Sequence, residues 1–89
     1  MPFAFDPAKS LYNKDKHGID FSEAQAIWSD PRCLIAPARN MSEPRFLAVG
    51  KIGGKIWAAV FTVRDGKVRI ISVRRARDQE IDRYEDDER

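Results

Sequence analysis

The residues whose chemistry stands out in this sequence are arginines and lysines on segments that read as strands. Arginine keeps its charge, and its planar guanidinium matches two phosphate oxygens at once. A group of such side chains can hold a phosphodiester and stabilise the charge that develops on it. The cations expected to do this are Arg45, Arg64 and Arg69, with Lys67 and Arg74 as further contacts to a substrate.

Groups that can move a proton are few, and three stand out: His17, Glu80 and Tyr84. Lys16 precedes the histidine and adds a contact for an anionic substrate. RNA can be cleaved without a metal when its 2′-hydroxyl attacks the adjacent phosphate, which requires a base, an acid and fixed positive charge. The residues of this sequence permit that reaction without proving it.

Each of these residues also has a purely structural interpretation. His17 can be the cation at the C-terminal end of a helix, where the helix dipole favours positive charge. Arg45 and Arg69 can be solvated strand residues. Tyr84 can anchor the last helix in the core while its hydroxyl reaches the surface. Both interpretations stay open when only the residues are considered.

Several classes of function can be set aside. One histidine and one cysteine, His17 and Cys33, are too few for a usual zinc site, so no metal is expected. The glycines form no phosphate-binding loop and no serine lies in a nucleophile turn, so no cofactor is expected. The single cysteine excludes an internal disulfide. No apolar run approaches the roughly 20 residues that span a bilayer, and we expect a cytoplasmic protein without membrane contact.

The net charge of +2 conceals an uneven distribution along the 89 residues. Residues 1–44 carry 5 Lys and Arg against 6 Asp and Glu, residues 45–77 carry 9 against 1, and residues 78–89 carry 2 against 7. The middle block therefore nets +8 and the last block −5. Such a distribution is typical of a surface that faces a polyanion, with an acidic tail beside it.

The chain is expected to form a single domain over residues 1–89, and its first part reads as two helices. Asp6 is the expected cap of a helix over residues 7–16. Asp20 and Glu23 have the spacing of a capping box at the start of a second helix. Apolar residues then share one face of that second helix.

The second part reads as a sheet and a last helix. A loop over residues 32–44, with one short edge strand near Leu34, leads to three strands of alternating period. The turns Gly53–Gly54 and Asp65–Gly66 join these strands as tight antiparallel hairpins. A weakly anchored helix follows from Arg75. The sequence therefore predicts an α+β fold with two N-terminal helices, an antiparallel sheet of about four strands and a C-terminal helix.

Two-residue turns also fix which strand residues face each other. Counting from the turns places Arg64 opposite Lys67 and Arg69 opposite Thr62, with Arg45 on the other side of Thr62. The four cations then share one corner of one sheet face. Their mutual repulsion requires solvation, pairing with acids or a bound anion.

The same count places Arg74 on the opposite face of the sheet, beside Trp57. This assignment depends on a regular strand, because side chains alternate between the two faces. One extra residue in a bulge would move Arg74 to the other face.

Several separated blocks of the sequence resemble one family. They are FDPAKSLYNKDKHGIDFSEA near the start, Glu43-x-Arg45-Phe46 with the following Val49-Gly50, FTVRDGKVRIISVRRA, and the segment from Glu80 to Tyr84-Glu85. In order, and across almost the whole chain, these blocks look like the BrnT toxins of BrnT/BrnA type II toxin-antitoxin pairs. That family has a fold similar to the RelE ribonucleases.

The resemblance implies an endoribonuclease that cleaves mRNA, inhibits translation and is neutralised by a BrnA-like antitoxin in a hetero-oligomer. The antitoxin would carry the DNA-binding part, so operator DNA is expected to be contacted only through it. The positions that fall on family motifs are Lys16, His17, Arg45, Arg64, Arg69, Arg74, Glu80 and Tyr84. A different class fits the same residues: a basic module that binds RNA or a partner without catalysis.

Overall fold

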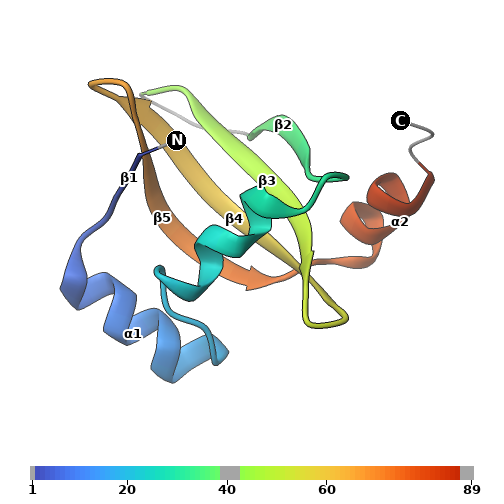
Figure 1. Cartoon of the computed structure of the whole chain (residues 1–89), viewed down its shortest axis with the longest axis horizontal. Helices are drawn as coiled ribbons and strands as arrows, with labels where there is room; N and C mark the ends of the chain where they lie inside the picture. Colours follow the sequence, from blue (N-terminus) through green and yellow to red (C-terminus); the bar gives the residue numbers. More distant parts are fainter. Residues whose placement is uncertain (1, 39–42, 87–89) are drawn as a thin grey trace.

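A five-stranded sheet with the strand order β1-β5-β4-β3-β2 forms the middle of the protein (Figure 1). The computed structural model describes residues 2–38 and 43–86. Along the chain the elements are β1 (Phe3–Ala4), α1 (Pro7–His17), the 3-10 helix η1 (Glu23–Ser29), β2 (Leu34–Ala38), β3 (Arg45–Ile52), β4 (Lys55–Arg64), β5 (Lys67–Arg75) and α2 (Asp78–Asp86). The predicted α+β class is confirmed. No helix among the described residues is long and apolar enough to cross a membrane.

The first predicted helix is confirmed and runs one residue further, to His17. At its start the Asp6 carboxylate accepts the Ala8 N–H at 2.9 Å. At its end Gly18 has a φ of 82° and donates its N–H to the Lys14 carbonyl at 2.9 Å. The cap and the glycine stop therefore act as the sequence predicts.

The second predicted helix forms as a 3-10 helix and not as an α-helix. Its predicted capping box is present, because the Asp20 carboxylate accepts the Glu23 N–H at 2.7 Å and the Glu23 carboxylate accepts the Asp20 N–H at 2.9 Å. A segment of 7 residues gains few i→i−4 bonds from α geometry, so packing can select the tighter form.

The sheet contains one strand that the sequence did not predict. The two residues of β1 pair parallel with β5, so that Phe3 faces Val68 and Ala4 faces Arg69. Two residues are too few to show the alternation of polar and apolar side chains that marks a strand. The sequence therefore contains no signal for β1. The sheet is therefore mixed and five-stranded, where about four antiparallel strands were predicted.

Close to its turn, each of the two hairpins has the predicted register. Arg64 faces Lys67 across the β4–β5 turn, and Thr62 faces Arg69 two residues further along. The edge strand predicted near Leu34 is also present, as β2, and it pairs antiparallel with β3. The strand ends that carry the candidate arginines therefore lie side by side.

A β-bulge in β5 changes the register further from the turn. Phe61 faces Ile70, but Val60 faces Ser72, so Ile71 has no partner on β4. One extra residue reverses which face of the sheet the following side chains occupy.

Because of this bulge, the predicted position of Arg74 is wrong. Arg74 faces Ala58 and lies on the same sheet face as Arg69. Trp57 faces Arg75 instead, and the Arg75 guanidinium carbon lies 5.5 Å from the centroid of the indole ring.

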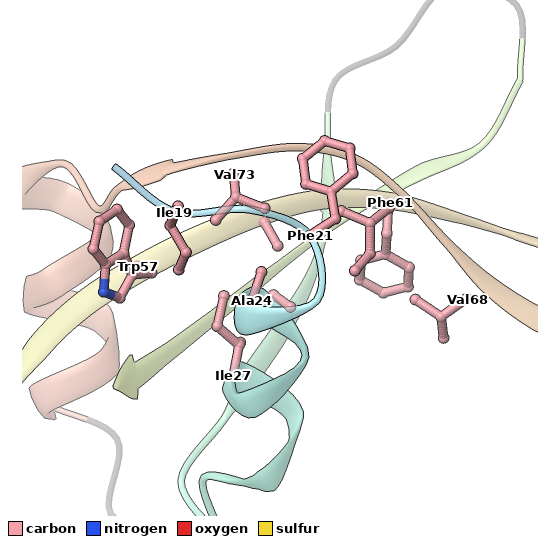
Figure 2. Close-up of a cluster of buried hydrophobic side chains, with 11 residues drawn as sticks. Ile19, Phe21, Ala24, Ile27, Trp57, Phe61, Val68 and Val73 are labelled. Carbon is pink, nitrogen blue, oxygen red and sulfur yellow. The ribbon is translucent and has the colours of Figure 1, made fainter. Parts of the chain in front are cut away.

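The main core lies between η1 and the sheet face that carries Trp57 (Figure 2). Ala24 and Ile27 of η1 are completely buried against this face. In the view of Figure 2, Trp57 lies at one end of the cluster and Phe61 and Val68 lie towards the other. The buried members are Ile19, Phe21, Ala24, Ile27, Ala48, Trp57, Ala59, Phe61, Val68, Ile70 and Val73.

The opposite face, hereafter the α2 face, is packed by α2 at one end. Val49 and Ala58 are buried there together with Tyr84 of α2. Towards the other end, Val60 and Arg69 on the same face are only half-buried. Solvent therefore reaches the part of the α2 face that the cations occupy.

Candidate functional site

Four of the predicted site residues come together at one corner of the α2 face, hereafter the cation corner: Arg45, Arg64, Lys67 and Arg69. The pairing of Phe46 with Phe61 continues by one residue to place Arg45 opposite Thr62, which faces Arg69 on its other side. The predicted pairing of Thr62 with Arg69 is therefore confirmed, and extending the β3–β4 register adds Arg45 to the row.

Thr62 fixes the centre of this row. Its side chain is buried, and its hydroxyl donates to the Pro44 carbonyl at 2.8 Å, which ties the start of β3 to β4. Arg45 and Arg69 therefore lie on either side of a buried, uncharged residue that cannot neutralise them.

Within the described residues, few carboxylates pair with the cations of the corner. Glu43 reaches the Arg64 guanidinium, with an Nη2 to Oε2 distance of 3.3 Å. Both side chains are exposed, so this pair contributes about 1 kcal/mol or less. No ion pair of Arg45, Lys67 or Arg69 is present among residues 2–38 and 43–86. Like charges on neighbouring strands repel, and an anion bound between them relieves this repulsion.

Arg74 and Glu80 form a separate group on the same face. The Arg74 guanidinium binds both carboxylate oxygens of Glu80, at 2.8 Å and 2.9 Å, and the Arg77 N–H also donates to that carboxylate at 2.8 Å. The bond from Arg74 lowers the pKa of Glu80, against a smaller opposing effect of burial and with help from the Arg77 N–H. The carboxylate is therefore ionised and fully engaged in holding α2.

Tyr84 lies in the same anchoring region. Its ring is buried, and its hydroxyl donates to the Asp30 carboxylate just after η1. Asp30 also accepts the N–H groups of Arg32 at 2.9 Å and Lys51 at 2.8 Å. Burial raises the pKa of Asp30, but these three hydrogen bonds outweigh it and leave the pKa below its ordinary value. The hydroxyl of Tyr84 thus joins α2 to the end of η1.

Lys16 and His17 lie apart from the other two groups, at the C-terminal end of α1. They line a cleft of about 280 Å³ between α1 and β5, to which Ile71 and Ser72 also contribute. Figure 1 shows α1 at the lower left, on the side of β5, and α2 at the right of the view. The predicted site residues therefore form three groups, and only the cation corner was predicted as a group.

Two larger hollows contain none of the predicted site arginines. One of about 490 Å³ is lined by Gly18, Ile19 and Trp57 among others. The other, of about 450 Å³, lies next to Asp30 and the β3–β4 turn. Among the described residues no three His, Cys, Asp or Glu side chains cluster as metal ligands. The hollows therefore add no chemistry to the cation corner.

Sequence reasoning missed two residues that contact the predicted site residues, Asp30 and Tyr12. Asp30 carries no spacing signal that links it to Tyr84, which is 54 residues away. Tyr12 does carry one, since it lies between Lys9 and Lys16 at spacings that place all three on one side of a helix. The structure places the three together in the cleft beside β5.

The comparison with protein families gives one result. A family model described as "Ribonuclease toxin, BrnT, of type II toxin-antitoxin system" matches residues 5–80. The matched range includes the whole cation corner, the α1–β5 cleft and the Arg74–Glu80 pair, and it ends before Tyr84. No curated protein matches the chain.

Proposed function

This chain belongs to the BrnT family of ribonuclease toxins of type II toxin-antitoxin systems, and we propose that it cleaves mRNA without a metal ion and thereby inhibits translation. The cation corner is the observation that supports this proposal most strongly. It gathers Arg45, Arg64, Lys67 and Arg69 on a sheet face that solvent reaches. A single RNA phosphate bound there would relieve the repulsion among these side chains.

In the proposed reaction, Arg45 and Arg69 hold the scissile phosphate from opposite sides of Thr62, while Arg64 and Lys67 add positive charge. The 2′-oxygen forms a bond to phosphorus, and the bond from phosphorus to the 5′-oxygen breaks. A base takes the proton of the 2′-hydroxyl and an acid gives one to the leaving 5′-oxygen. The products are a 2′,3′-cyclic phosphate and a 5′-hydroxyl.

His17 is the favoured proton-transfer group in this proposal. Histidine is the side chain most used for general acid and base catalysis. His17 shares its cleft with Ser72, which lies three residues after Arg69 on β5. Glu80 and Tyr84 are the further candidates, and their hydrogen bonds to Arg74 and Asp30 favour anchoring of α2 as their main role.

The proposal includes a protein partner. A cognate BrnA-like antitoxin would form a hetero-oligomer with this chain in the cytoplasm, and any contact with operator DNA would go through the antitoxin. Acidic side chains of that partner would suit the cation corner, so the inhibitor and the RNA would compete for the same charges.

The deciding experiment uses Arg69→Ala, with Arg75→Ala as a matched control. Both substitutions remove one arginine from β5, but Arg75 lies beside Trp57 on the other face. The unchanged chain is expected to arrest growth when induced alone and to be relieved by the adjacent open reading frame. The purified chain and Arg75→Ala should cleave RNA, whereas Arg69→Ala should do so at least about 100-fold more slowly. Full cleavage by Arg69→Ala would show that the mechanism is wrong.

A second candidate function is a basic module that binds RNA or a partner without cleaving RNA. The engagement of Glu80 and Tyr84 in hydrogen bonds favours it, because it removes two of the three proposed proton-transfer groups from the corner. An all-deoxy analogue distinguishes the two functions. A ribonuclease cannot cut it, since the 2′-hydroxyl is the nucleophile. A non-catalytic binder would leave ribose and deoxyribose strands alike intact and release both with salt.

A further inference from the structure

Apart from His17, the residues that line the cleft between α1 and β5 have no role in the reaction described above. The described residues that line it are Lys9, Tyr12, Asn13, Lys16, His17, Phe21, Ile71 and Ser72. None of them is a carboxylate, while Lys9, Lys16 and His17 bring cationic or ionisable nitrogen. The cleft therefore favours an anionic ligand with an apolar or aromatic part.

The walls of the cleft are held in place by buried contacts. Asn13 donates to the Val73 carbonyl at 2.9 Å and to the Ile19 carbonyl at 2.8 Å, and it accepts the Val73 N–H at 3.1 Å. These bonds fix α1 along the part of β5 that lies beyond the short strand β1. The bulge at Ile71 lies in the same stretch. A ligand would therefore meet a largely preformed surface.

Tyr12 is the exposed aromatic side chain of this cleft. Its exposed fraction is 65%, and the Lys16 ammonium lies 5.8 Å from the centroid of its ring. Lys9, three residues before Tyr12 on the same helix, also lines the cleft. Neither lysine forms an ion pair within the described residues. An aromatic ring flanked by unpaired cations is the arrangement with which proteins hold single-stranded nucleic acid.

The position of the cleft relative to the cation corner decides between a nucleotide and other anions. Ser72 faces Val60 and so lies on the α2 face, three residues along β5 from Arg69. Three residues of a strand span at most about 10 Å, so the cleft lies close to the cation corner. An RNA strand that left the corner past Ser72 would enter the cleft that Tyr12 also lines.

We propose that this cleft is a subsite for a nucleotide of single-stranded RNA that flanks the scissile phosphate. The base stacks on the ring of Tyr12, and Lys9 and Lys16 bind the adjacent backbone phosphate. This inference rests on the proposed function, because it takes the cation corner as the place of cleavage. It adds a second contact point outside the reacting atoms.

The test measures binding of a short, fluorescein-labelled 2′-O-methyl oligoribonucleotide of mixed sequence, which cannot be cleaved. Tyr12→Ala is expected to weaken this binding about tenfold, because the stacked base loses its partner. Tyr12→Phe keeps the ring and should bind like the unchanged chain. Leu11→Ala, at a neighbouring position with 73% exposure, is the control for the helix surface and should also bind normally.

Cleavage of unmodified RNA by the same variants separates this inference from the proposed function. If the unchanged chain cleaves RNA and Tyr12→Ala binds the probe equally well, the subsite is wrong while the function stands. A loss of binding in Tyr12→Phe as large as in Tyr12→Ala would contradict stacking. If Tyr12→Ala loses affinity for the antitoxin but not for the probe, the cleft is a protein interface. Failure of the unchanged chain both to bind and to cleave would overturn both proposals.

Discussion

The guanidinium of Arg74 on β5 binds both carboxylate oxygens of Glu80 on α2, with distances of 2.8 Å and 2.9 Å between nitrogen and oxygen. The bulge at Ile71 makes this contact possible, since it turns Arg74 to the face on which α2 lies. Glu80 also accepts the Arg77 N–H at the start of α2. One carboxylate thus joins the sheet, the connecting turn and the last helix.

Glu80→Gln is predicted to lower the free energy of unfolding by about 1 to 2 kcal/mol near pH 7. The folded state holds the pKa of Glu80 below its ordinary value, mainly through the bond from Arg74. The ionised carboxylate therefore adds stability above the unfolded pKa, about 4.3, and this stability is lost as the pH falls through the lower folded pKa.

Urea unfolding at about pH 7 and about pH 3 measures this effect. The difference between the unchanged chain and Glu80→Gln should shrink at the lower pH, because a pH of about 3 lies below the unfolded pKa and uptake of a proton there accompanies unfolding. Glu85→Gln, an exposed position on the same helix, is the control and should change little at either pH. An equal loss at both values would mean that the ionised pair does not carry the stability.

Tyr84→Phe is predicted to cost about 1 to 2 kcal/mol of stability and to leave RNA cleavage unchanged. The buried ring stays in place, but the hydrogen bond to Asp30 is lost. The pKa of Asp30 should rise towards its ordinary value, because that bond is one of those that lower it. Urea unfolding and cleavage rates are measured side by side. A fall in cleavage of about 100-fold, with stability unchanged, would instead identify Tyr84 as a proton-transfer group.

The parts of this fold that follow from local rules could be predicted from the sequence. The cap at Asp6 and the turn at Asp65–Gly66 depend on neighbouring residues, and the second of these fixes Thr62 opposite Arg69. Arg64, Lys67 and Arg69 lie within a few residues of the Asp65–Gly66 turn, so counting from that turn places them. Arg45 follows from the regular pairing of β3 with β4. The strand register of these residues is therefore the part of the candidate site that the sequence could predict.

Contacts that depend on packing could not be predicted in this way. The bulge at Ile71 has no sequence signal, and it moved Arg74 to the other face. Asn13 bonds to both backbone groups of Val73, a residue 60 positions away, and takes the place of a missing strand partner there. The link between Tyr84 and Asp30 is of the same kind, so the roles of the residues on α2 required the structure.

Gly50→Ala is predicted to destabilise the fold by about 1 to 3 kcal/mol through overpacking. A Cβ atom at Gly50 would lie 2.8 Å from the backbone oxygen of Ile27 and 3.0 Å from its side chain. The nearest atom belongs to the backbone of η1, so the helix would have to move away from the sheet. Thermal unfolding measures the loss, with Val63→Ala on the same sheet, 56% exposed, as a control of small effect. Stability equal to that of the unchanged chain would show that η1 is less tightly fixed than this contact requires.

Glu43→Gln is predicted to strengthen binding of RNA by a few-fold at low salt. Glu43 is the described acid that pairs with a cation of the corner, through Arg64 at 3.3 Å. The exposed pair adds little stability, so its removal should leave the fold intact. Without the carboxylate, Arg64 no longer divides its charge between an internal acid and a phosphate, and the potential over the corner becomes more positive.

Anisotropy of a labelled, non-cleavable 2′-O-methyl RNA, titrated at low salt and at about 1 M salt, measures the change. The gain should vanish at high salt, because the screening length there falls to about 3 Å. Glu85→Gln removes the same charge from α2, outside the corner, and should give a smaller gain. Weaker binding by Glu43→Gln would mean that the carboxylate orients Arg64 towards the RNA, and the corner would then need Glu43 as a positioning residue.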